Sequence, residues 1–546
     1  MKFAFLALLP AFFISHTLQA HTLAEAATQQ AKQLKAGCIV TGERIGDEVR
    51  FAIAGKAPEA KDTPPEKIVF EIGSITKVFT GLLLAQAVVE KKVTLETTVG
   101  SLLILKRPFD DPRIAAITLE QLSTHTSGLP RLPANAAAGM AEEDPYANYD
   151  GKLLGAFLTN AKLEGEGPYA CSYSNVGVGL LGYLLGRVYE TTWEDAVTKK
   201  VCLPLGLNDT AVKPARMPHA TPHAGEKVVR PWHFNAMAGA GALRSTAADM
   251  LKFGDALLHP EKTPLKEAFA IALKPHADAP ALGGQIGLGV FISKLDGDLT
   301  FHHDGGTGGY CSGLQVIPAK SIVRVVLISN NSLGGSAVIS ATSKAKTTPP
   351  TVQKEITLPA ESMQQYPGVY EMDRDSRFTV LLRDGQLWVN LTGQAFLRAF
   401  AKAPDRFFYK AVAAEIGFNR DKDAIQSLTL FQNGRELTAK RVSGTPPDYK
   451  LRTSKELQPY AGEYAVMGLK KLTVTVRANT LFAQLEGQPS VPVFETAADR
   501  FEYDVVDATL VFTRDDKKKI NGLTLLQNGL SMPAARVTSR SSAPKQ

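Results

Sequence analysis

The last third of the chain contains a tandem repeat, and this repeat constrains the fold more than any other feature. Tyr366–Tyr370 reads YPGVY, and Tyr460–Tyr464 reads YAGEY at an offset of 94 residues (366 to 460). The triplet DRF at Asp405–Phe407 returns at Asp499–Phe501 with the same offset. A repeat of this length is one structural unit copied once, so both segments are expected to have the same fold.

Each copy of the repeat has the pattern of an antiparallel β-barrel. Short runs of alternating apolar and polar residues are separated by turn dipeptides such as Asp384-Gly385 and Asn433-Gly434, which favour two-residue hairpins. We predict two lipocalin-like barrels of about eight strands each, over 357–446 and 453–539. The polar, proline-closed stretch before them predicts an interdomain linker over 342–356.

The N-terminus has the pattern of a secretory signal peptide. Lys2 precedes an apolar run from Phe3 to Ile14, and the small residue Ala20 ends the segment. A membrane anchor is the alternative, but a helix needs about 20 apolar residues to span a bilayer. We therefore predict that residues 1–20 are removed, that the protein is periplasmic or secreted, and that it has no stable membrane anchor.

Composition and charge limit the class of protein. Of the 546 residues, 44% are hydrophobic and 21% are charged, which is typical of a folded chain. The net charge is +7 and the basic residues are scattered, which argues against a nucleic-acid partner. Neither Cys-x-x-Cys nor His-Glu-x-x-His occurs, so we predict no metal and no cofactor. The four cysteines are expected to be free and buried, although export would permit disulfides: Cys38, Cys171, Cys202 and Cys311.

The region before the repeat mixes helical and strand patterns. A second helix is expected to begin at Thr246, where Asp249 resembles the acid of a capping box. The β-branched run over 323–328 predicts a buried strand. Together these patterns predict one mixed α/β domain over 27–341. The other predicted helix of this region is amphipathic and starts after Ser74. It is predicted from apolar residues three or four positions apart: Val78, Leu82, Ala85 and Val89.

Ser74 and Lys77 are the first candidate catalytic pair. At positions i and i+3 of a helix they lie on one face, close enough for the amine to take the proton of the hydroxyl. Ser74 follows Gly73 at the predicted start of the helix. The exposed amides and the dipole at such a start favour the negative charge that develops on an attacked carbonyl oxygen.

Tyr173 and Asn175 are the second candidate pair. Two residues apart in an extended segment, they project to the same side, so a phenol and an amide can face one pocket. Tyr146 and Asn148 have the same spacing, but several acidic residues surround them. We interpret that segment as a solvated loop.

His303 begins the third candidate motif, a histidine followed by Asp304 and the glycines Gly305 and Gly306. Glycines at the end of a strand let a substrate approach the backbone closely. A glycine-rich hairpin without function is the alternative interpretation.

In this order the three motifs resemble those of the penicillin-recognising serine hydrolases, the group of class C β-lactamases, D-aminopeptidases, DD-peptidases and esterases. The resemblance covers roughly residues 30–335, and the combination of motifs is specific where each motif alone is not. It implies a β-lactamase-like α+β (α/β) domain with a central antiparallel sheet flanked by helices, followed by the two antiparallel β-barrels. It is carried by five segments: Phe70–Gly81, Ile117–Pro130, Tyr173–Gly182, Pro204–Thr210 and Gly241–Met250.

The resemblance also implies roles for the candidate residues. Ser74 would be the nucleophile and Lys77 a neutral amine base, which requires a pKa far below the usual 10.4 or so. Tyr173 would relay a proton to the leaving group, and Asn175 would hold the substrate amide. The backbone N–H groups of Ser74 and Gly306 would form the oxyanion hole. His303, at the start of the third motif, would be a fourth catalytic residue, and Asp304, Gly305 and Gly306 would contact the substrate together with Asn175.

The third motif departs from the Lys-Thr-Gly of true class C β-lactamases. His303 is a weaker anion anchor than lysine, and the negative charge of Asp304 would repel a substrate carboxylate. Alternatively, Asp304 turns away and pairs with Arg131 or Arg244. The sequence favours an exported amide-cleaving serine hydrolase acting on peptides with D- or non-standard residues, of D-aminopeptidase or linear-microcystin type. A β-lactamase, a carboxylesterase and a penicillin-acylated binding protein are the alternatives, so the partners are a peptide, β-lactam or ester.

Overall fold

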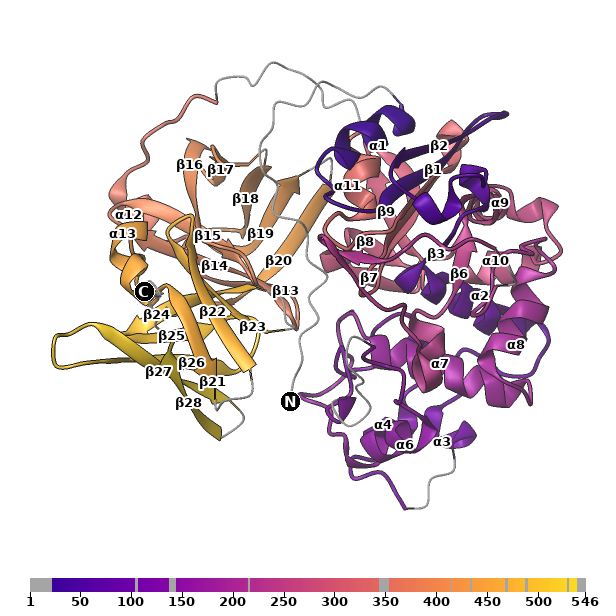
Figure 1. The fold of residues 1–546 in the computed structure, drawn as a ribbon, viewed down its shortest axis with the longest axis horizontal. Helices are drawn as coiled ribbons and strands as arrows, with labels where there is room; N and C mark the ends of the chain where they lie inside the picture. Colours follow the sequence, from indigo (N-terminus) through magenta and orange to yellow (C-terminus); the bar gives the residue numbers. More distant parts are fainter. Residues whose placement is uncertain are drawn as a thin grey trace, which may run out of the picture. The chain divides into compact units, whose positions relative to one another are not determined.

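The computed structural model describes most of the chain (Figure 1). The predicted signal peptide, residues 343–352 of the predicted linker and the Asn433-Gly434 turn lie outside the described residues. The described chain divides into two compact units, an N-terminal domain and the pair of barrels. The described residues are 22–103, 107–136, 144–214, 217–342, 353–412, 414–432, 435–466, 470–486, 490–527 and 530–537.

An eight-stranded antiparallel sheet forms the centre of the N-terminal domain. Its strand order is β2-β1-β12-β11-β10-β9-β8-β7, so the first two strands of the chain lie beside the last one of this domain. The predicted strand over 323–328 is confirmed as part of β12. Its strands are β1 (Cys38–Ile45), β2 (Glu48–Gly55), β7 (Ala277–Ala279), β8 (Gly284–Ile286), β9 (Phe291–Leu295), β10 (Asp298–Gly306), β11 (Cys311–Ile317) and β12 (Ile322–Ile328).

Helices cover both faces of this sheet (Figure 1). Two short two-stranded sheets lie outside it, β3 (Val69–Glu71) with β6 (Arg244–Thr246) and β4 (His223–Ala224) with β5 (Lys227–Val228). The helices of this domain are α1 (Leu23–Ala31), α2 (Thr76–Val89), α3 (Val99–Leu102), α4 (Arg113–Ala116), α5 (Leu119–Ser123), α6 (Gly151–Asn160), α7 (Asn175–Val188), α8 (Trp193–Val197), α9 (Ala247–Leu258), α10 (Lys266–Ala272) and α11 (Gly335–Ser340).

Alternate residues of the central strands pack into two different cores. On β12, Val326 and Ile328 pack in a cluster with α1 and α11. Their neighbours Val325 and Leu327 belong to the main core, which contains residues of α2, α7 and α9. Successive side chains of a strand point to opposite faces, so α1 and α11 cover one face and the larger helical layer covers the other.

Two predictions about the helices need correction. The helix after Ser74 is not amphipathic, because α2 is surrounded by other elements and nearly all of its residues are buried. Thr246 caps α9 by accepting a hydrogen bond from the N–H of Asp249, as predicted. The carboxylate of Asp249, however, accepts hydrogen bonds from the Asp209 backbone at 2.7 Å and the Thr210 hydroxyl at 3.0 Å instead of completing a capping box.

The C-terminal unit consists of two closed eight-stranded antiparallel barrels in which consecutive strands pair. The predicted barrel pair is therefore confirmed, and with it the predicted fold class. Short helices α12 (Ala360–Met363) and α13 (Ser454–Leu457) precede the barrels. The first barrel comprises β13 (Gly368–Asp373), β14 (Ser376–Arg383), β15 (Gln386–Leu391), β16 (Leu397–Ala403), β17 (Arg406–Tyr409), β18 (Ala414–Asp421), β19 (Ala424–Gln432) and β20 (Arg435–Ser443). The second comprises β21 (Gly462–Val466), β22 (Lys470–Arg477), β23 (Thr480–Leu485), β24 (Val491–Ala497), β25 (Arg500–Tyr503), β26 (Ala508–Arg514), β27 (Ile520–Gln527) and β28 (Leu530–Arg536).

The repeated sequence positions make the same contacts in both barrels. Asp405 forms a salt bridge with Arg420 at 2.8 Å, and the equivalent Asp499 pairs with Arg514 at 2.7 Å. The repeated YxGxY motifs behave alike, since the second tyrosine hydroxyl donates to the carbonyl of the first at 2.7 Å in each barrel. The duplication therefore preserved these internal contacts in both barrels.

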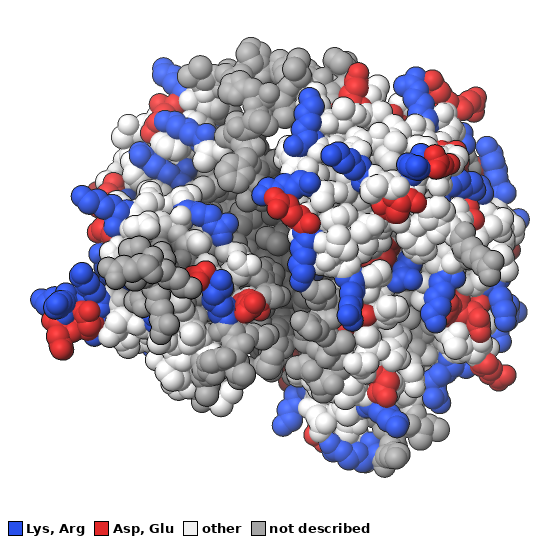
Figure 2. All heavy atoms as spheres, in the orientation of Figure 1, with Lys and Arg blue, Asp and Glu red and all other residues white. Residues whose placement is uncertain are grey.

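Three global properties follow from the described residues. Cys38, Cys171, Cys202 and Cys311 are free thiols, as predicted, and all except Cys311 are fully buried. Within the described ranges, no helix combines the length and apolarity that crossing a membrane requires. On the face shown in Figure 2, basic and acidic side chains are interspersed rather than gathered into one patch.

Candidate active site

Ser74 and Lys77 lie in contact at the start of α2. Ser74 belongs to the 3₁₀ turn Gly73–Ile75 that leads into the helix, and Lys77 lies in the first turn of α2. The Nζ atom of Lys77 lies 3.0 Å from Oγ of Ser74 and donates a hydrogen bond to the carbonyl oxygen of Ala240 at 2.7 Å. The predicted meeting of these two side chains is confirmed.

The surroundings of Lys77 favour a neutral amine. Its side chain is completely buried, and this burial lowers its pKa well below the usual value, with a further decrease from the positive charge of Arg131. A neutral amine has two N–H donors and one lone pair. Because one N–H is directed at Ala240, the lone pair is available for the proton of Ser74, as in an activated serine nucleophile.

Two glycines allow β10 to approach the turn that holds Ser74. Gly73 has a φ of +50°, which is strained for other residues. A Cβ atom at Gly73 would lie 2.6 Å from the backbone nitrogen of Gly306. A Cβ atom at Gly305 would lie 2.0 Å from the carbonyl oxygen of Ile72. Side chains at either position would therefore push the strand away from the nucleophile.

The N–H group of Gly306 is directed out of the sheet ladder. The N–H of Thr307 donates to the carbonyl oxygen of Tyr310 in the hairpin after β10. Successive N–H groups of a strand point to opposite sides, so that of Gly306 points away from β11. Its nitrogen is also the first atom that a Cβ atom at Gly73 would meet. This arrangement is compatible with an oxyanion hole formed by the N–H groups of Ser74 and Gly306.

Tyr173 completes the group around the nucleophile. Its phenol is hydrogen-bonded to Ser74, and burial raises the pKa of Tyr173 to about 12. The Nζ atom of Lys77 lies 4.9 Å from the centre of the tyrosine ring. The phenol therefore stays protonated at neutral pH, which suits a proton relay and leaves Lys77 as the stronger candidate for the base.

Asn175 and Tyr146 lie together, which sequence interpretation did not anticipate. Asn175 is the first residue of α7, and its side chain is hydrogen-bonded to the phenol of Tyr146. Tyr146 is buried and its ring stacks on Phe234 with a centroid distance of 5.0 Å. The predicted solvated loop is therefore wrong at Tyr146. The acidic residues around Tyr146 suggested an exposed loop. Asp144, however, lies 2.7 Å from the His233 ring within the protein, so this part of the segment is not solvated.

His303 lies on the same side of β10 as the helical layer. It is buried against Phe291, with ring centroids 4.2 Å apart. Its Nδ1 lies 2.6 Å from the carbonyl oxygen of Asp304. Burial lowers the pKa of His303 to about 3. The imidazole is therefore neutral at physiological pH and carries no charge to anchor an anion.

Asp304 points to the opposite side of β10 from His303. It pairs with Gly313 on β11, whereas His303 pairs with Leu314, and cross-strand partners share a face. A Cβ atom at Gly313 would contact α11 at Gly335, so Asp304 lies on the α11 side of the sheet. Its negative charge still raises the pKa of Tyr173. Arg244, one of the two partners considered for Asp304, forms its salt bridge with Glu71 at 3.1 Å.

Comparison with known protein families shows to which family the chain belongs. Residues 25–348 match the family described as Beta-lactamase, which is more than half of the chain. The chain belongs to the β-lactamase family. Membership in this family implies serine hydrolase activity. Two further segments of this β-lactamase-family chain, 352–441 and 446–535, each match a domain of unknown function, DUF3471.

Several curated bacterial proteins are similar to this β-lactamase-family chain. Penicillin-binding protein 4 of Amycolatopsis lactamdurans is 27% identical over 282 residues, 47% of this chain and 71% of that protein. Penicillin-binding protein 4* of Bacillus subtilis (strain 168) is 23% identical over 407 residues, 68% of this chain and 88% of that protein. The D-alanyl-D-alanine-carboxypeptidase/endopeptidase AmpH of Escherichia coli (strain K12) is 24% identical over 307 residues, 53% of this chain and 78% of that protein.

A solved structure supports the fold of the N-terminal domain. The class C β-lactamase from Rhodobacter sphaeroides aligns with a TM-score of 0.50 at 21% identity, covering 59% of this chain and 97% of that one. The fold predicted from the three motifs is thus confirmed for the β-lactamase-family domain.

His125 is a residue of the site that no sequence motif pointed to. Its carbonyl oxygen accepts from the N–H of Ser172 at 2.8 Å, and its Nδ1 accepts from the N–H of Ser174 at 3.1 Å. The imidazole ring lies 4.5 Å from the ring of Tyr173. His125 therefore holds the backbone on both sides of the tyrosine and supports its ring as well.

Arg131, considered from the sequence only as a partner for Asp304, lies beside Tyr173. Its guanidinium carbon lies 5.0 Å from the centre of the Tyr173 ring. Its carbonyl oxygen accepts from the N–H of Asn175 at 2.9 Å. The loop from His125 to Arg131 thus positions the whole segment that carries Tyr173 and Asn175.

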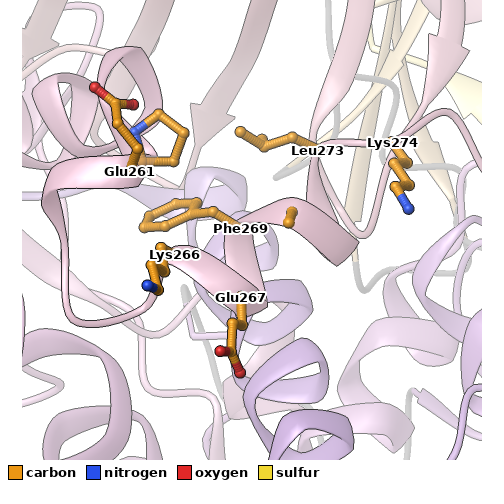
Figure 3. Close-up of a pocket in the computed structure, with 8 residues that line it drawn as sticks. Glu261, Lys266, Glu267, Phe269, Leu273 and Lys274 are labelled. Atoms are coloured by element: carbon orange, nitrogen blue, oxygen red, sulfur yellow. The ribbon is translucent and has the colours of Figure 1, made fainter.

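A surface hollow on α10 does not compete with this site. It is lined by residues between Pro260 and Lys274, with the ring of Phe269 at its centre (Figure 3). None of its lining residues is a serine, histidine, cysteine or tyrosine. The candidate chemistry is therefore at Ser74. In the ranges that the structure covers, histidine, cysteine and acidic residues form no group of three that could hold a metal ion.

Proposed function

We propose that the protein is an exported serine hydrolase that cleaves an amide bond through an acyl-Ser74 intermediate. Its substrates would be peptides that contain D- or other non-standard residues. The observation that carries this proposal is the buried amine of Lys77, 3.0 Å from the Ser74 hydroxyl, with the phenol of Tyr173 bonded to the same serine.

The acylation step assigns one proton transfer to each group. Ser74 Oγ attacks the carbonyl carbon while its proton moves to the lone pair of Lys77. The oxyanion is stabilised by the N–H groups of Ser74 and Gly306. The phenol of Tyr173 then passes a proton to the leaving nitrogen and regains one from Lys77, so the C–N bond breaks and an ester remains on Ser74.

Deacylation uses the same groups in reverse. A water molecule replaces the departed amine and gives a proton to Lys77, directly or through Tyr173, as it attacks the ester carbon. The acid product leaves with the hydroxyl of water, and the proton returns to Ser74 Oγ. Asn175 would hold the substrate amide, and Gly305 would leave space for the substrate backbone beside β10.

The choice among substrates draws on the relatives and on Asp304. The name of AmpH refers to D-alanine peptides, which favours a peptidase acting on D-residues, whether of D-aminopeptidase or linear-microcystin type. Asp304 faces the α11 side of β10, so its charge gives weaker grounds for excluding a substrate carboxylate. A β-lactamase, a carboxylesterase and a penicillin-acylated binding protein remain the alternatives.

A substrate panel tests the proposal. Purified protein and a Ser74→Ala control are assayed with D-Ala-p-nitroanilide, linearised microcystin, p-nitrophenyl butyrate and nitrocefin. We expect release from at least one D-residue amide, absent in the control. Fast nitrocefin turnover with the peptides inert would contradict the peptidase proposal. A stable adduct on Ser74 without product release would identify a binding protein.

Export and the exact domain limits belong to the proposal as well. The signal-peptide pattern supports removal of residues 1–20 and a periplasmic or secreted protein. We propose domain limits of 27–341, 357–446 and 453–539, with a linker over 342–356. Mass spectrometry of the mature N-terminus would test the first point, and limited proteolysis would test the second.

A further inference from the structure

Arg131 places a positive charge inside the catalytic group. Its guanidinium carbon lies 5.0 Å from the ring of Tyr173, and Tyr173 is bonded to Ser74. The charge of Arg131 also acts on Lys77 and His125, where it adds to the lowering of the pKa by burial, and on Tyr146, whose pKa burial raises despite this charge. The guanidinium therefore lies on the ring of Tyr173, the same ring that the Nζ atom of Lys77 approaches to 4.9 Å.

The charge of Arg131 has no counterion among the described residues. No carboxylate of the described ranges forms a salt bridge with it, and its buried Nε has no hydrogen-bond partner there. Arg244, which lies in the same domain, is paired with Glu71. A guanidinium held beside buried groups without an acid normally costs stability. Arg131 is partly exposed, so part of the residue is accessible from solvent.

The third motif offers no competing anion anchor. His303 is buried against Phe291 and neutral. Lys77 is occupied by Ser74 and Ala240. An anionic substrate group that enters beside Tyr173 therefore meets one permanent cation, Arg131. A guanidinium binds a carboxylate through two parallel hydrogen bonds, which fixes its orientation as well as its position.

We propose that Arg131 is the residue that recognises an anionic group of the substrate, a carboxylate in the case of a peptide. This inference rests on the proposed function, since it concerns the same cleft. It reverses the expectation, drawn from His303 and Asp304 alone, that substrates with a free carboxylate bind poorly. Arg131 supplies the charge that the third motif lacks, from the loop that also holds Asn175 in place.

Equilibrium binding tests this role without requiring turnover. The probes are N-acetyl-D-Ala-D-Ala with a free C-terminal carboxylate and the same peptide as its C-terminal amide. Their dissociation constants are measured by calorimetry in the full-length Ser74→Ala variant, alone and combined with Arg131→Met, Arg131→Lys or Arg187→Met. Arg187 is an exposed arginine near the end of α7, so its replacement controls for the loss of one positive charge.

We expect the carboxylate to bind roughly 10- to 100-fold more tightly than the amide, the range of a charge-assisted bidentate pair. Arg131→Met should reduce this ratio to about 1, Arg131→Lys should retain part of it, and Arg187→Met should leave it unchanged. Equal binding of the two peptides before substitution, a ratio that survives Arg131→Met, or binding of neither peptide would overturn the assignment.

Activity measurements separate this inference from the proposed function. If the carboxylate preference is present and depends on Arg131 while wild-type protein hydrolyses no amide, the recognition role stands and the hydrolase proposal fails. The opposite outcome is hydrolysis with the same kcat/KM for the peptide with a free C-terminal carboxylate and for its C-terminal amide, in both wild type and Arg131→Met. In that case the hydrolase proposal stands and the recognition role fails.

Discussion

Replacing Gly73 with alanine should damage catalysis far more than stability. The left-handed φ of +50° costs a non-glycine residue about 1–2 kcal/mol. The new Cβ would lie 2.6 Å from the nitrogen of Gly306, whereas ordinary contacts begin at 3.4 Å. Strand and turn must therefore separate by about 3.4 − 2.6 = 0.8 Å. A displacement near 1 Å, or the loss of one oxyanion donor, lowers kcat by roughly 100-fold or more.

Gly206→Ala is the matched control for this prediction. Gly206 has a φ of +68°, and a Cβ atom there would have no neighbour within 4 Å. Gly206→Ala should therefore lower Tm through the φ cost alone, by a few degrees as a rough guide, and Gly73→Ala by at least as much. Only Gly73→Ala should lower kcat, measured with the best substrate of the panel. A Gly73→Ala protein with kcat within about threefold of wild type would refute the role of this contact in holding Gly306 beside Ser74.

Three further predictions concern Lys77, His303 and His125. Burial lowers the pKa of Lys77 well below its usual value, so the acylation rate should fall only as the pH drops through that lowered pKa; a rate that climbs toward pH 10.5 would contradict it. Lys77→Arg should lower the acylation rate by at least roughly 100-fold, since a guanidinium stays protonated and cannot accept the proton of Ser74. His303 has a folded pKa of about 3 against 6.5 unfolded, so the unfolded state binds more protons between these values. Stability should fall as pH drops from 6.5 toward 3, by up to about 1.4 kcal/mol per unit, and urea unfolding of His303→Gln should show a shallower dependence. His125→Phe keeps a ring beside Tyr173 but removes the Nδ1 acceptor, so we expect kcat to fall about 10-fold with KM nearly unchanged; an altered KM with normal kcat would speak against a positioning role.

The parts of the site that the sequence predicted are those set by local geometry. Ser74 and Lys77 meet because three residues separate them in a helical start. The glycines of the third motif are needed because β10 touches the nucleophile turn. The barrels were predictable because each strand pattern occurs twice, once in each copy of the repeat. The equivalent ion pairs Asp405–Arg420 and Asp499–Arg514 show that the two copies have similar structures.

The parts that escaped prediction depend on contacts between distant segments. His125 and Tyr173 are 48 residues apart (125 to 173), and no spacing rule joins them. The burial of Tyr146 depends on Phe234, far along the chain, which outweighed the acidic residues beside it. The direction of Asp304 depends on its register with Gly313, which composition does not reveal. The burial of nearly all of α2 also escaped prediction, because the elements that pack around this helix cannot be identified from its own pattern of apolar residues.

The acyl-enzyme at Ser74 is the most direct test of the account. Wild-type protein and the Ser74→Ala variant are mixed with the best amide substrate, quenched within milliseconds and digested. Mass spectrometry then locates any added acyl group. The account predicts an added mass on the peptide that contains Ser74, formed and lost at rates compatible with turnover and absent in Ser74→Ala. Product formation that persists in Ser74→Ala, or an acyl group on another residue, would contradict it.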